Sequence, residues 1–363
     1  MMKVADYLLK ITPYEGGKPI EELQRDLGLS DVIKLASNEN PLGPSKKVIE
    51  TICKIAVNVN LYPDGNAYYL TQKLAKHLGV SEKNLIFGNG SDEIIELLYK
   101  AFATNQNDEI LYCYPTFIEY RIIGMAFNKK IIELPLKNFA YDIDNLIKHI
   151  NENTRIIFIN TPNNPTGTLT GLDDILKIIN KASKDTLIVI DEAYYEYAKP
   201  STHYKELLDL YKKENVIILR TFSKAYALAG LRIGYGIANE FIIQTLNRVR
   251  PPFNVNIVAQ AAAIAALDDK EHLKKSIKTN EEGKQFLYEQ FNKLNLFYVP
   301  TFANFILFST PIDASIVYEN LLKEGVIVRS MKPYGYNNFL RVTVGTQKEN
   351  EIFIQKLKKV LHV

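Results

Sequence analysis

The sequence predicts an α/β protein, in which a large domain with a mostly parallel central sheet precedes a smaller α+β C-terminal domain. Between residues 84 and 237, short apolar runs rich in β-branched residues alternate with helical patterns. This alternation is typical of a parallel sheet covered on both faces. After residue 250, long helices and short strands follow without that regularity. A chain of 363 residues is also long for one simple core, so two domains are expected.

The elements are expected in this order. Residues 1–30 precede the alternating pattern and are predicted to form an N-terminal arm. In the large domain, residues 31–250, we predict strands over 85–87, 109–113, 130–134, 154–159, 186–190, 216–219 and 233–237, and helices from Ser91 and over 116–126 and 173–182. In the small domain, residues 251–363, we predict helices over 254–267, 268–294, 313–323 and 347–360, and strands over 304–308, 326–329 and 339–344.

Composition narrows the possible functions. The net charge is +3 and no long basic run occurs, which argues against a nucleic-acid-binding protein. The two cysteines and five histidines are scattered, so no metal site is expected. Residues 1–17 lack the apolar stretch of a signal peptide, and the longest small-apolar segment, 259–267, is shorter than the about 20 residues that span a bilayer. We therefore expect a soluble, cytoplasmic protein without a membrane segment.

A lysine and an arginine eight residues apart indicate a cofactor. Lys224 comes just after the predicted strand at 216–219, Ser223 precedes it, and Arg232 lies beyond a stretch of small residues. An amine can form a Schiff base with pyridoxal phosphate, and hydroxyl and guanidinium groups can hold the phosphate. Asp191 ends the preceding strand, where a carboxylate can face the pyridine nitrogen; its alternative role is to cap the next helix.

Two further segments follow predicted strands. In residues 89–93 (NGSDE), Ser91 is a suitable N-cap and Asp92 suits the positive end of the helix dipole. The N–H groups of such a helix start can hold a phosphate, although an ordinary capped helix has the same pattern. Residues 161–167 (TPNNPTG) are interpreted either as a rigid turn or as a loop that presents an asparagine amide to a ligand.

Together these blocks resemble the fold-type I pyridoxal-phosphate enzymes, in particular the class I/II aminotransferases. NPTG (164–167), DEAY (191–194) and SK (223–224), with an arginine eight residues after the lysine, occur in the family's order. The resemblance implies a fold-type I architecture, pyridoxal 5'-phosphate as cofactor and Lys224 as the catalytic residue. The other residues that it places around the cofactor are Ser91, Asp92, Tyr114, Asn164, Asp191, Tyr194, Ser223 and Arg232.

The resemblance also implies individual roles. Lys224 forms the Schiff base, and Asp191 pairs with the protonated ring nitrogen. Tyr194 and Asn164 donate hydrogen bonds to the phenolic oxygen of the ring, and Tyr114 stacks on the ring. The residues near the cofactor phosphate are Ser91, Asp92, Ser223 and Arg232.

The N-terminal part is similar to the histidinol-phosphate subfamily of these aminotransferases. The similarity covers residues 13–23, 33–44 and 61–64. It implies that Tyr62 reaches the cofactor phosphate of a neighbouring subunit, so that the chain forms a homodimer with shared sites. The subfamily usually has an arginine at Leu61, but the tyrosine carries the contact. Tyr14 of the arm is implied to contact the substrate.

Arg341 lies within a predicted strand and is interpreted in two ways. It either faces solvent, or it anchors the anionic group of the substrate with help from Arg329. Asn164 is also expected to contact the substrate. A guanidinium binds carboxylate and phosphate through the same paired N–H groups. One arginine could therefore serve two different anionic substrates.

The resemblance implies a ping-pong transamination of L-histidinol phosphate with 2-oxoglutarate. This step of histidine biosynthesis yields imidazole-acetol phosphate and glutamate, with the cofactor alternating between pyridoxal and pyridoxamine forms. An aromatic or broad-specificity aminotransferase would use the same residues, and a threonine-phosphate decarboxylase resembles the subfamily closely. A non-catalytic cofactor-binding regulator is a further alternative, against which we note that no DNA-binding region is predicted before the arm.

Overall fold

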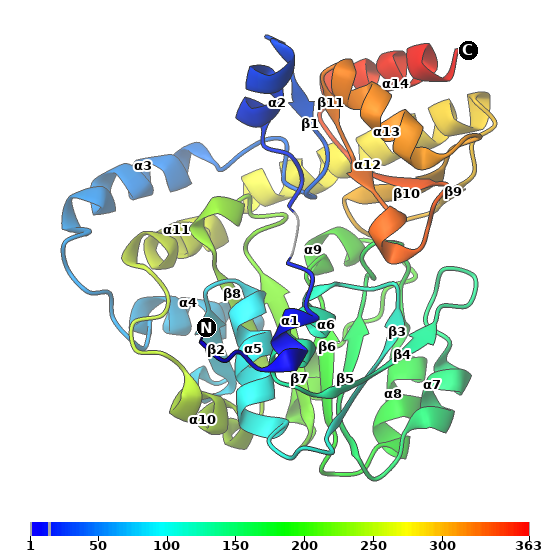
Figure 1. The fold of residues 1–363 in the computed structure, drawn as a ribbon. Helices are drawn as coiled ribbons and strands as arrows, with labels where there is room; N and C mark the ends of the chain where they lie inside the picture. Colours follow the sequence, from blue (N-terminus) through cyan, green and yellow to red (C-terminus); the bar gives the residue numbers. More distant parts are fainter. Residues whose placement is uncertain (1, 14–15, 363) are drawn as a thin grey trace.

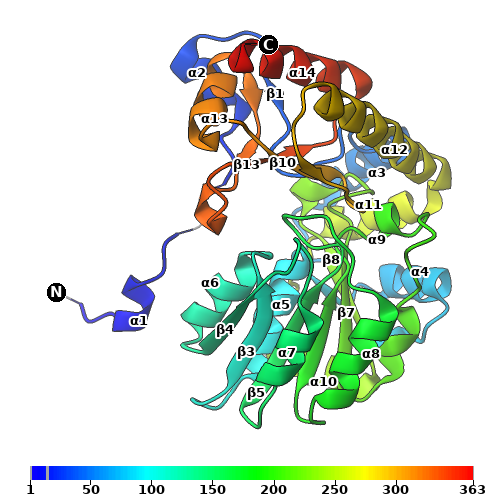
Figure 2. The same cartoon turned by 90° about the vertical axis from the view of Figure 1, so that its right-hand side faces the viewer.

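The computed structural model describes residues 2–13 and 16–362, which form two unequal parts (Figure 1). The larger part is a sheet with helices on both faces. The smaller part contains most of the C-terminal third of the chain. Figure 2 shows it above one end of the large sheet, with the short helix α1 set apart from it.

Seven strands of the described chain form the large sheet, in the order β2-β8-β7-β6-β5-β3-β4. The strands are β2 (Leu85–Gly88), β3 (Glu109–Tyr114), β4 (Lys130–Pro135), β5 (Thr154–Asn160), β6 (Leu187–Asp191), β7 (Val216–Thr221) and β8 (Gly234–Ala238). β3 to β7 pair in parallel, whereas β8 runs antiparallel to both β7 and β2. The predicted mostly parallel sheet is confirmed.

Helices cover both faces of this sheet because its strands are apolar on both sides. In β5, Ile156 and Phe158 pack into one helical layer, whereas Ile157 and Ile159 pack into the other. The first layer consists of α5 (Ser91–Phe102), α6 (Glu119–Ala126) and α10 (Glu240–Val249). The second consists of α4 (Tyr68–Leu78), α7 (Ile143–His149), α8 (Leu172–Lys181) and α11 (Ile257–Asp268), with α3 (Lys46–Ile55) beside α11.

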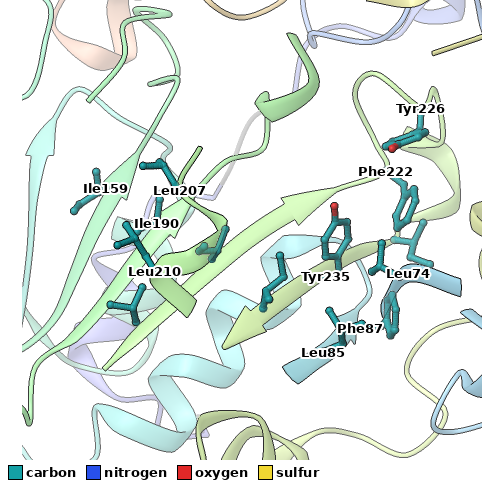
Figure 3. Close-up of a cluster of buried hydrophobic side chains, with 14 of the residues drawn as sticks. Leu74, Leu85, Phe87, Ile159, Ile190, Leu207, Leu210, Phe222, Tyr226 and Tyr235 are labelled. Atoms are coloured by element: carbon teal, nitrogen blue, oxygen red, sulfur yellow. The ribbon is translucent and has the colours of Figure 1, made fainter. Parts of the chain in front are cut away.

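Figure 3 shows part of the second interface. Ile159 of β5 and Ile190 of β6 lie beside Leu207 and Leu210, which belong to the connection before β7. These side chains are almost completely removed from water, which is the main favourable contribution to folding. The ends of β5, β6 and β7 are therefore held rigidly, and the site described below is built on them.

The smaller part combines an antiparallel sheet with long helices. The sheet order is β12-β13-β10-β9. The strands are β9 (Tyr298–Val299), β10 (Phe305–Ser309), β12 (Arg329–Ser330) and β13 (Phe339–Thr343), and the helices are α12 (Lys270–Lys293), α13 (Ala314–Lys323) and α14 (Gln347–Leu361). Phe291, Phe308 and Phe353 join the helices to the sheet in a separate core. This arrangement is the predicted α+β pattern.

The N-terminal segment contributes to both parts. α1 (Asp6–Leu9) lies beside α6 of the larger part. α2 (Ile20–Leu27) packs Leu23 into a cluster with Leu322 and Ile327 of the smaller part. β1 (Ile33–Lys34) pairs in parallel with β11 (Val326–Ile327). Short helical turns, α9 (Tyr195–Ala198) among them, complete the connections.

The observed division differs from the predicted ranges 1–30, 31–250 and 251–363. α2 and β1 join the smaller part because they complete its core and pair with its strand. α11 follows the predicted boundary at residue 251, yet its alanines pack into the core of the larger part, so the smaller part resumes at α12. Within the described residues, every helix is too short or too polar to cross a membrane.

Candidate active site

A cavity of about 240 Å³ lies between the two parts of the molecule. Asn160, Asp191 and Thr221, the last residues of β5, β6 and β7, line it from the sheet. Ligands bind at this end of parallel sheets because the strand ends and the following loops converge there. The predicted site residues that line the cavity are Ser91, Asp92, Asn164, Asp191, Tyr194, Ser223, Lys224, Arg232, Arg329 and Arg341.

Lys224 presents an amine in this cavity. Its Nζ donates a hydrogen bond to the carbonyl oxygen of Ser37 at 3.3 Å and lies 5.7 Å from the ring centroid of Tyr194. Burial, followed by the positive charge of Arg341, lowers the pKa of Lys224 to about 8. Because the neutral amine is the form that attacks a carbonyl carbon, this environment makes Lys224 a better nucleophile near neutral pH.

Asp191 presents a buried carboxylate that is 2% exposed. Its Oδ2 accepts a hydrogen bond from the Tyr120 hydroxyl at 2.6 Å, and its Oδ1 accepts one from the Ala193 amide at 3.2 Å. Burial raises the pKa of Asp191 to about 6, although both hydrogen bonds oppose the rise. Sequence reasoning missed Tyr120, because nothing local distinguishes it from the other tyrosines.

The start of α5 forms another wall of the cavity. Gly90, with a φ of 79°, occupies the N-cap position, and Ser91 is the first helical residue. The prediction that Ser91 is the N-cap is therefore wrong. The N-cap is the preceding residue, Gly90, whose positive φ glycine adopts more easily than other residues. A side chain at Gly234 would collide with the Ser91 backbone, so glycine allows the close approach. Arg232 Nη2 lies 2.7 Å from Asp92 Oδ2, which brings a guanidinium to a helix N-terminus, an arrangement that suits phosphate.

Tyr194 and Asn164 are held by polar neighbours. The Tyr194 hydroxyl accepts a hydrogen bond from Asn38 Nδ2 at 2.8 Å. Burial raises the pKa of Tyr194 to about 12, so the group stays a neutral hydroxyl that can donate. Asn164 Oδ1 accepts a hydrogen bond from Arg341 Nη1, which leaves the amide nitrogen of Asn164 as a donor.

Arg329 and Arg341 are direct cross-strand neighbours in β12 and β13, and both line the cavity. Arg341 is 6% exposed and donates from Nη2 to the carbonyl oxygen of Ala36 at 2.6 Å, so the alternative in which it faces solvent is wrong. Like charges opposite each other destabilise an antiparallel pair. An anion bound between the two guanidinium groups would offset this repulsion.

Tyr114 does not line the cavity. Its ring stacks on Tyr334 with centroids 6.2 Å apart, and the Arg121 guanidinium lies 4.5 Å from its centroid. Alternation along β3 explains this position, because Tyr114 shares a sheet face with Tyr112 and packs beside the α5–α6 layer. Phe117, three residues later, lines the cavity, as do Tyr194 and Tyr334, and its ring could stack on a ligand.

Of the remaining predicted site residues, Tyr62 lies apart from this cavity and Tyr14 is not among the residues that the structure describes. Tyr62 is 82% exposed, and its ring stacks on Phe253 with centroids 4.8 Å apart. Cavity-lining residues that sequence reasoning did not select include Ser37, Asn38, Phe117, Glu119 and Thr221. The polar run SNEN at 37–40 was the available signal for Asn38, because it interrupts an otherwise apolar segment.

The residues fit pyridoxal phosphate. A buried carboxylate suits a protonated ring nitrogen, an amine of lowered pKa suits the aldehyde, and hydroxyl and amide donors suit the phenolic oxygen. The α5 N-terminus, Ser223 and Arg232 supply donors and positive charge for the phosphate. Among the described residues, no cluster of histidine, cysteine or carboxylate side chains is arranged to hold a metal ion.

Comparison with known proteins identifies the class. The family model of aminotransferase class I and II matches residues 30–357. The chain belongs to this family, and the predicted fold-type I architecture is confirmed.

Several curated relatives that match almost the whole chain are histidinol-phosphate aminotransferases. The histidinol-phosphate aminotransferase of Moorella thermoacetica is 48% identical over 361 residues, covering 99% of this chain and 93% of the relative. That of Caldicellulosiruptor saccharolyticus is 46% identical over 351 residues, covering 97% and 98%. The crystal structure of the Sinorhizobium meliloti histidinol-phosphate aminotransferase in complex with pyridoxal-5'-phosphate has a TM-score of 0.90 at 25% identity, covering 100% and 98%. The predicted subfamily resemblance is confirmed.

Proposed function

We propose that this protein transfers the amino group of L-histidinol phosphate to 2-oxoglutarate, giving imidazole-acetol phosphate and glutamate in histidine biosynthesis. The main support is one cavity that contains a buried lysine, a buried aspartate and two cross-strand neighbouring arginines. The chain is also 48% identical to a histidinol-phosphate aminotransferase. Pyridoxal 5'-phosphate, when bound, supplies an electron sink that lets the hydrogen of the amine-bearing carbon leave as a proton.

Asp191 holds the positive charge of the cofactor ring. A cationic partner in the cavity lowers the pKa of this carboxyl from its value of about 6, so the group is ionised at neutral pH. The Tyr120 hydroxyl favours the same charged form and fixes the orientation of the carboxylate. Tyr194 and the Asn164 amide donate to the phenolic oxygen.

Lys224 is proposed to move a proton between the amine-bearing carbon of the substrate and a carbon of the cofactor. In the cofactor-free cavity its amine has a pKa of about 8, so the free lysine would be a suitable general base near neutral pH. The amine would take a proton from the amine-bearing carbon of the substrate and could give it back to the cofactor when pyridoxal phosphate is bound. One buried residue can do both because it follows the rigid end of β7.

Arg329 and Arg341 bind the anionic end of both substrates. In the first half-reaction they hold the phosphate of histidinol phosphate, and in the second they hold a carboxylate of 2-oxoglutarate. Paired N–H groups fit either oxyanion, so one site serves both substrates in turn, as a ping-pong mechanism requires. Ser91, Asp92, Ser223 and Arg232 line the part of the cavity that would hold the cofactor phosphate, and Arg232 would be its cationic partner.

The proposal includes a homodimer in which Tyr62 completes the partner's cavity. Tyr62 is exposed and is absent from the residues that line the cavity of its own chain. It lies in an exposed apolar segment together with Val57, Val59, Leu61 and Tyr69. Such a patch is unusual on a monomer and suits a second copy of the chain.

Subunit complementation tests the shared site. Tyr62→Ala and Lys224→Ala homodimers are each expected to be nearly inactive. Mixing them under exchanging conditions should restore activity, because the hybrid has one cavity with both residues. No recovery, with hybrid formation verified, would contradict the shared site. The proposed cytoplasmic location would be checked by fractionating cells.

The reaction is tested by mixing the holoenzyme with L-histidinol phosphate while recording the cofactor absorbance. Transamination predicts bleaching of the visible band, followed by its recovery when 2-oxoglutarate is added. Lys224→Ala is the control, in which neither change is expected at a comparable rate. An unchanged spectrum with confirmed cofactor would exclude the proposal.

The same assay separates the alternatives. Faster bleaching by phenylalanine than by histidinol phosphate would indicate an aromatic or broad-specificity aminotransferase. Carbon dioxide released from threonine phosphate would indicate a decarboxylase. No comparison above favours either over histidinol-phosphate transamination, since the structural match to an L-threonine-O-3-phosphate decarboxylase, at 22% identity, shows the fold alone.

A further inference from the structure

The buried side chain of Asn38 connects Tyr194 to the strand that carries Arg341. Asn38 is 1% exposed and lines the cavity. Its Nδ2 donates to the Tyr194 hydroxyl at 2.8 Å. Its backbone amide donates to Thr343 Oγ1 at 2.9 Å, and Thr343 Oγ1 donates to Asn38 Oδ1 at 3.4 Å. Thr343 is the last residue of β13 and lies two positions after Arg341.

The backbone of Asn38 is held in an uncommon conformation. Its φ is 56°, in the left-handed region that asparagine and glycine tolerate better than other residues. Asn304 Nδ2 of the β9–β10 segment donates to the Asn38 carbonyl oxygen at 3.0 Å. The smaller part therefore imposes a conformation that aims the Asn38 amide at Tyr194, and such imposed strain is often found at functional sites.

The direction of the hydrogen bond has a chemical consequence. A tyrosine hydroxyl has one hydrogen to donate and lone pairs to accept with. Because the Asn38 amide donates to the Tyr194 oxygen, the hydroxyl hydrogen of Tyr194 stays available for another acceptor. The Thr343 hydroxyl determines which end of the amide faces Tyr194, since it donates to Oδ1 and leaves Nδ2 on the other side.

We propose that Asn38 is a positioning residue that directs the hydroxyl hydrogen of Tyr194 into the cavity, onto the phenolic oxygen of the cofactor. This inference rests on the proposed function, because it requires pyridoxal phosphate in the cavity. A donor on the phenolic oxygen stabilises its negative charge. It therefore lowers the pH at which the linkage between Lys224 and the cofactor gains a proton.

Charged groups from several elements also act on Tyr194. They are Arg341 of β13, Asp191 of β6 and Asp92 of α5. The Lys224 nitrogen, which would be linked to the cofactor in the holoenzyme, lies 5.7 Å from the ring centroid. A substitution of Asn38 by an uncharged residue leaves these groups in place. Any change in the pH at which the linkage between Lys224 and the cofactor gains a proton therefore measures the effect of the hydrogen bond from Asn38 to Tyr194.

The test is a pH titration of the visible absorbance of the holoenzyme, without any amino substrate. Asn38→Gly keeps the left-handed backbone and removes the amide. It is expected to raise the midpoint by about one pH unit, a tenfold change in proton affinity, as for a lost hydrogen bond to a charged oxygen. Asn38→Asp should raise it further, because its carboxylate accepts the Tyr194 hydrogen and adds a negative charge.

Two controls separate positioning from a purely structural role. In a Tyr194→Phe background, Asn38→Gly should produce no further shift, because the hydroxyl through which it acts is gone. Thr343→Val should shift the midpoint in the same direction as Asn38→Gly, whereas Thr343→Ser, which keeps the hydroxyl, should leave it unchanged.

The proposal is overturned if Asn38→Gly and Thr343→Val leave the midpoint at its wild-type value, or if Asn38→Gly shifts it equally with and without the Tyr194 hydroxyl. Loss of thermal stability without a spectral shift would assign Asn38 to structure alone and would also overturn it. No amino substrate is used, so the result does not depend on whether L-histidinol phosphate is the substrate.

Discussion

Replacing Asp191 by asparagine is expected to stabilise the cofactor-free protein while removing its activity. The carboxylate is 2% exposed, and burial raises its pKa from 3.8 to about 6 in spite of the hydrogen bond from Tyr120. Asparagine has almost the same shape; its Oδ1 can accept the hydrogen bond from the Ala193 amide, and its Nδ2 can donate to the Tyr120 oxygen. It has no charge to desolvate, so the substitution removes a cost that the function imposes on the fold.

The size of the effect follows from the pKa shift. A rise of about two pH units at about 1.4 kcal/mol each gives an ionised carboxylate that costs up to about 3 kcal/mol. The folded-state pKa lies above the unfolded-state pKa, so the cost is absent below about pH 4, where both states are protonated. The cost grows as the pH rises from the unfolded-state pKa of 3.8 to the folded-state pKa of about 6, and it is constant above about pH 7. The gain in free energy of unfolding of the Asp191→Asn variant should therefore be largest above about pH 7.

Urea denaturation of the cofactor-free proteins between about pH 5 and pH 8 measures this difference. Asp185→Asn, at an exposed position before β6, is the matched control and should change little at any pH. With cofactor present, the wild type should become the more stable protein, because it binds the cofactor more tightly. The reasoning would be refuted if cofactor-free Asp191→Asn were no more stable than the wild type at pH 8, or if its gain did not vary with pH.

Three further substitutions test separate parts of the structure. Gly167→Ala should lower the free energy of unfolding by about 2 kcal/mol or more in thermal denaturation, because Gly167 has a φ of 77° and a side chain there collides with Thr301. Arg341→Lys should raise KM for both L-histidinol phosphate and 2-oxoglutarate by about 10- to 100-fold, and an increase for one alone would contradict a shared anion site. Tyr120→Phe should raise the pKa of Asp191, because the hydrogen bond to its carboxylate is lost. As the pH falls, cofactor affinity, measured by fluorescence titration, should then be lost at a pH about one unit higher than in the wild type. An unchanged pH profile would show that the Tyr120 hydroxyl does not stabilise the carboxylate.

The sequence by itself predicted the strands of the large sheet, in order, and the lysine, aspartates and arginines that line the cavity. Asp191 follows a short apolar run rich in β-branched residues, which favours a buried strand, and Lys224 comes just after another. In a parallel sheet, the carboxyl ends of neighbouring strands lie side by side, so residues at these ends meet whatever the rest of the chain does. Local pattern was therefore enough to place Asp191 and Lys224 at the same end of the sheet.

Only the tertiary structure decided which residues support that site and which part of the molecule each segment joins. Tyr120 reaches Asp191 across 71 positions, Asn38 reaches Tyr194 across 156, and Asn38 meets Thr343 across 305. Tyr114 and Phe117 both pack against the α5–α6 layer, yet only Phe117 lines the cavity, so the path of the chain after β3 decided which ring enters it. Such contacts join residues far apart in the chain, and packing between elements creates them, so no local pattern in the sequence records them.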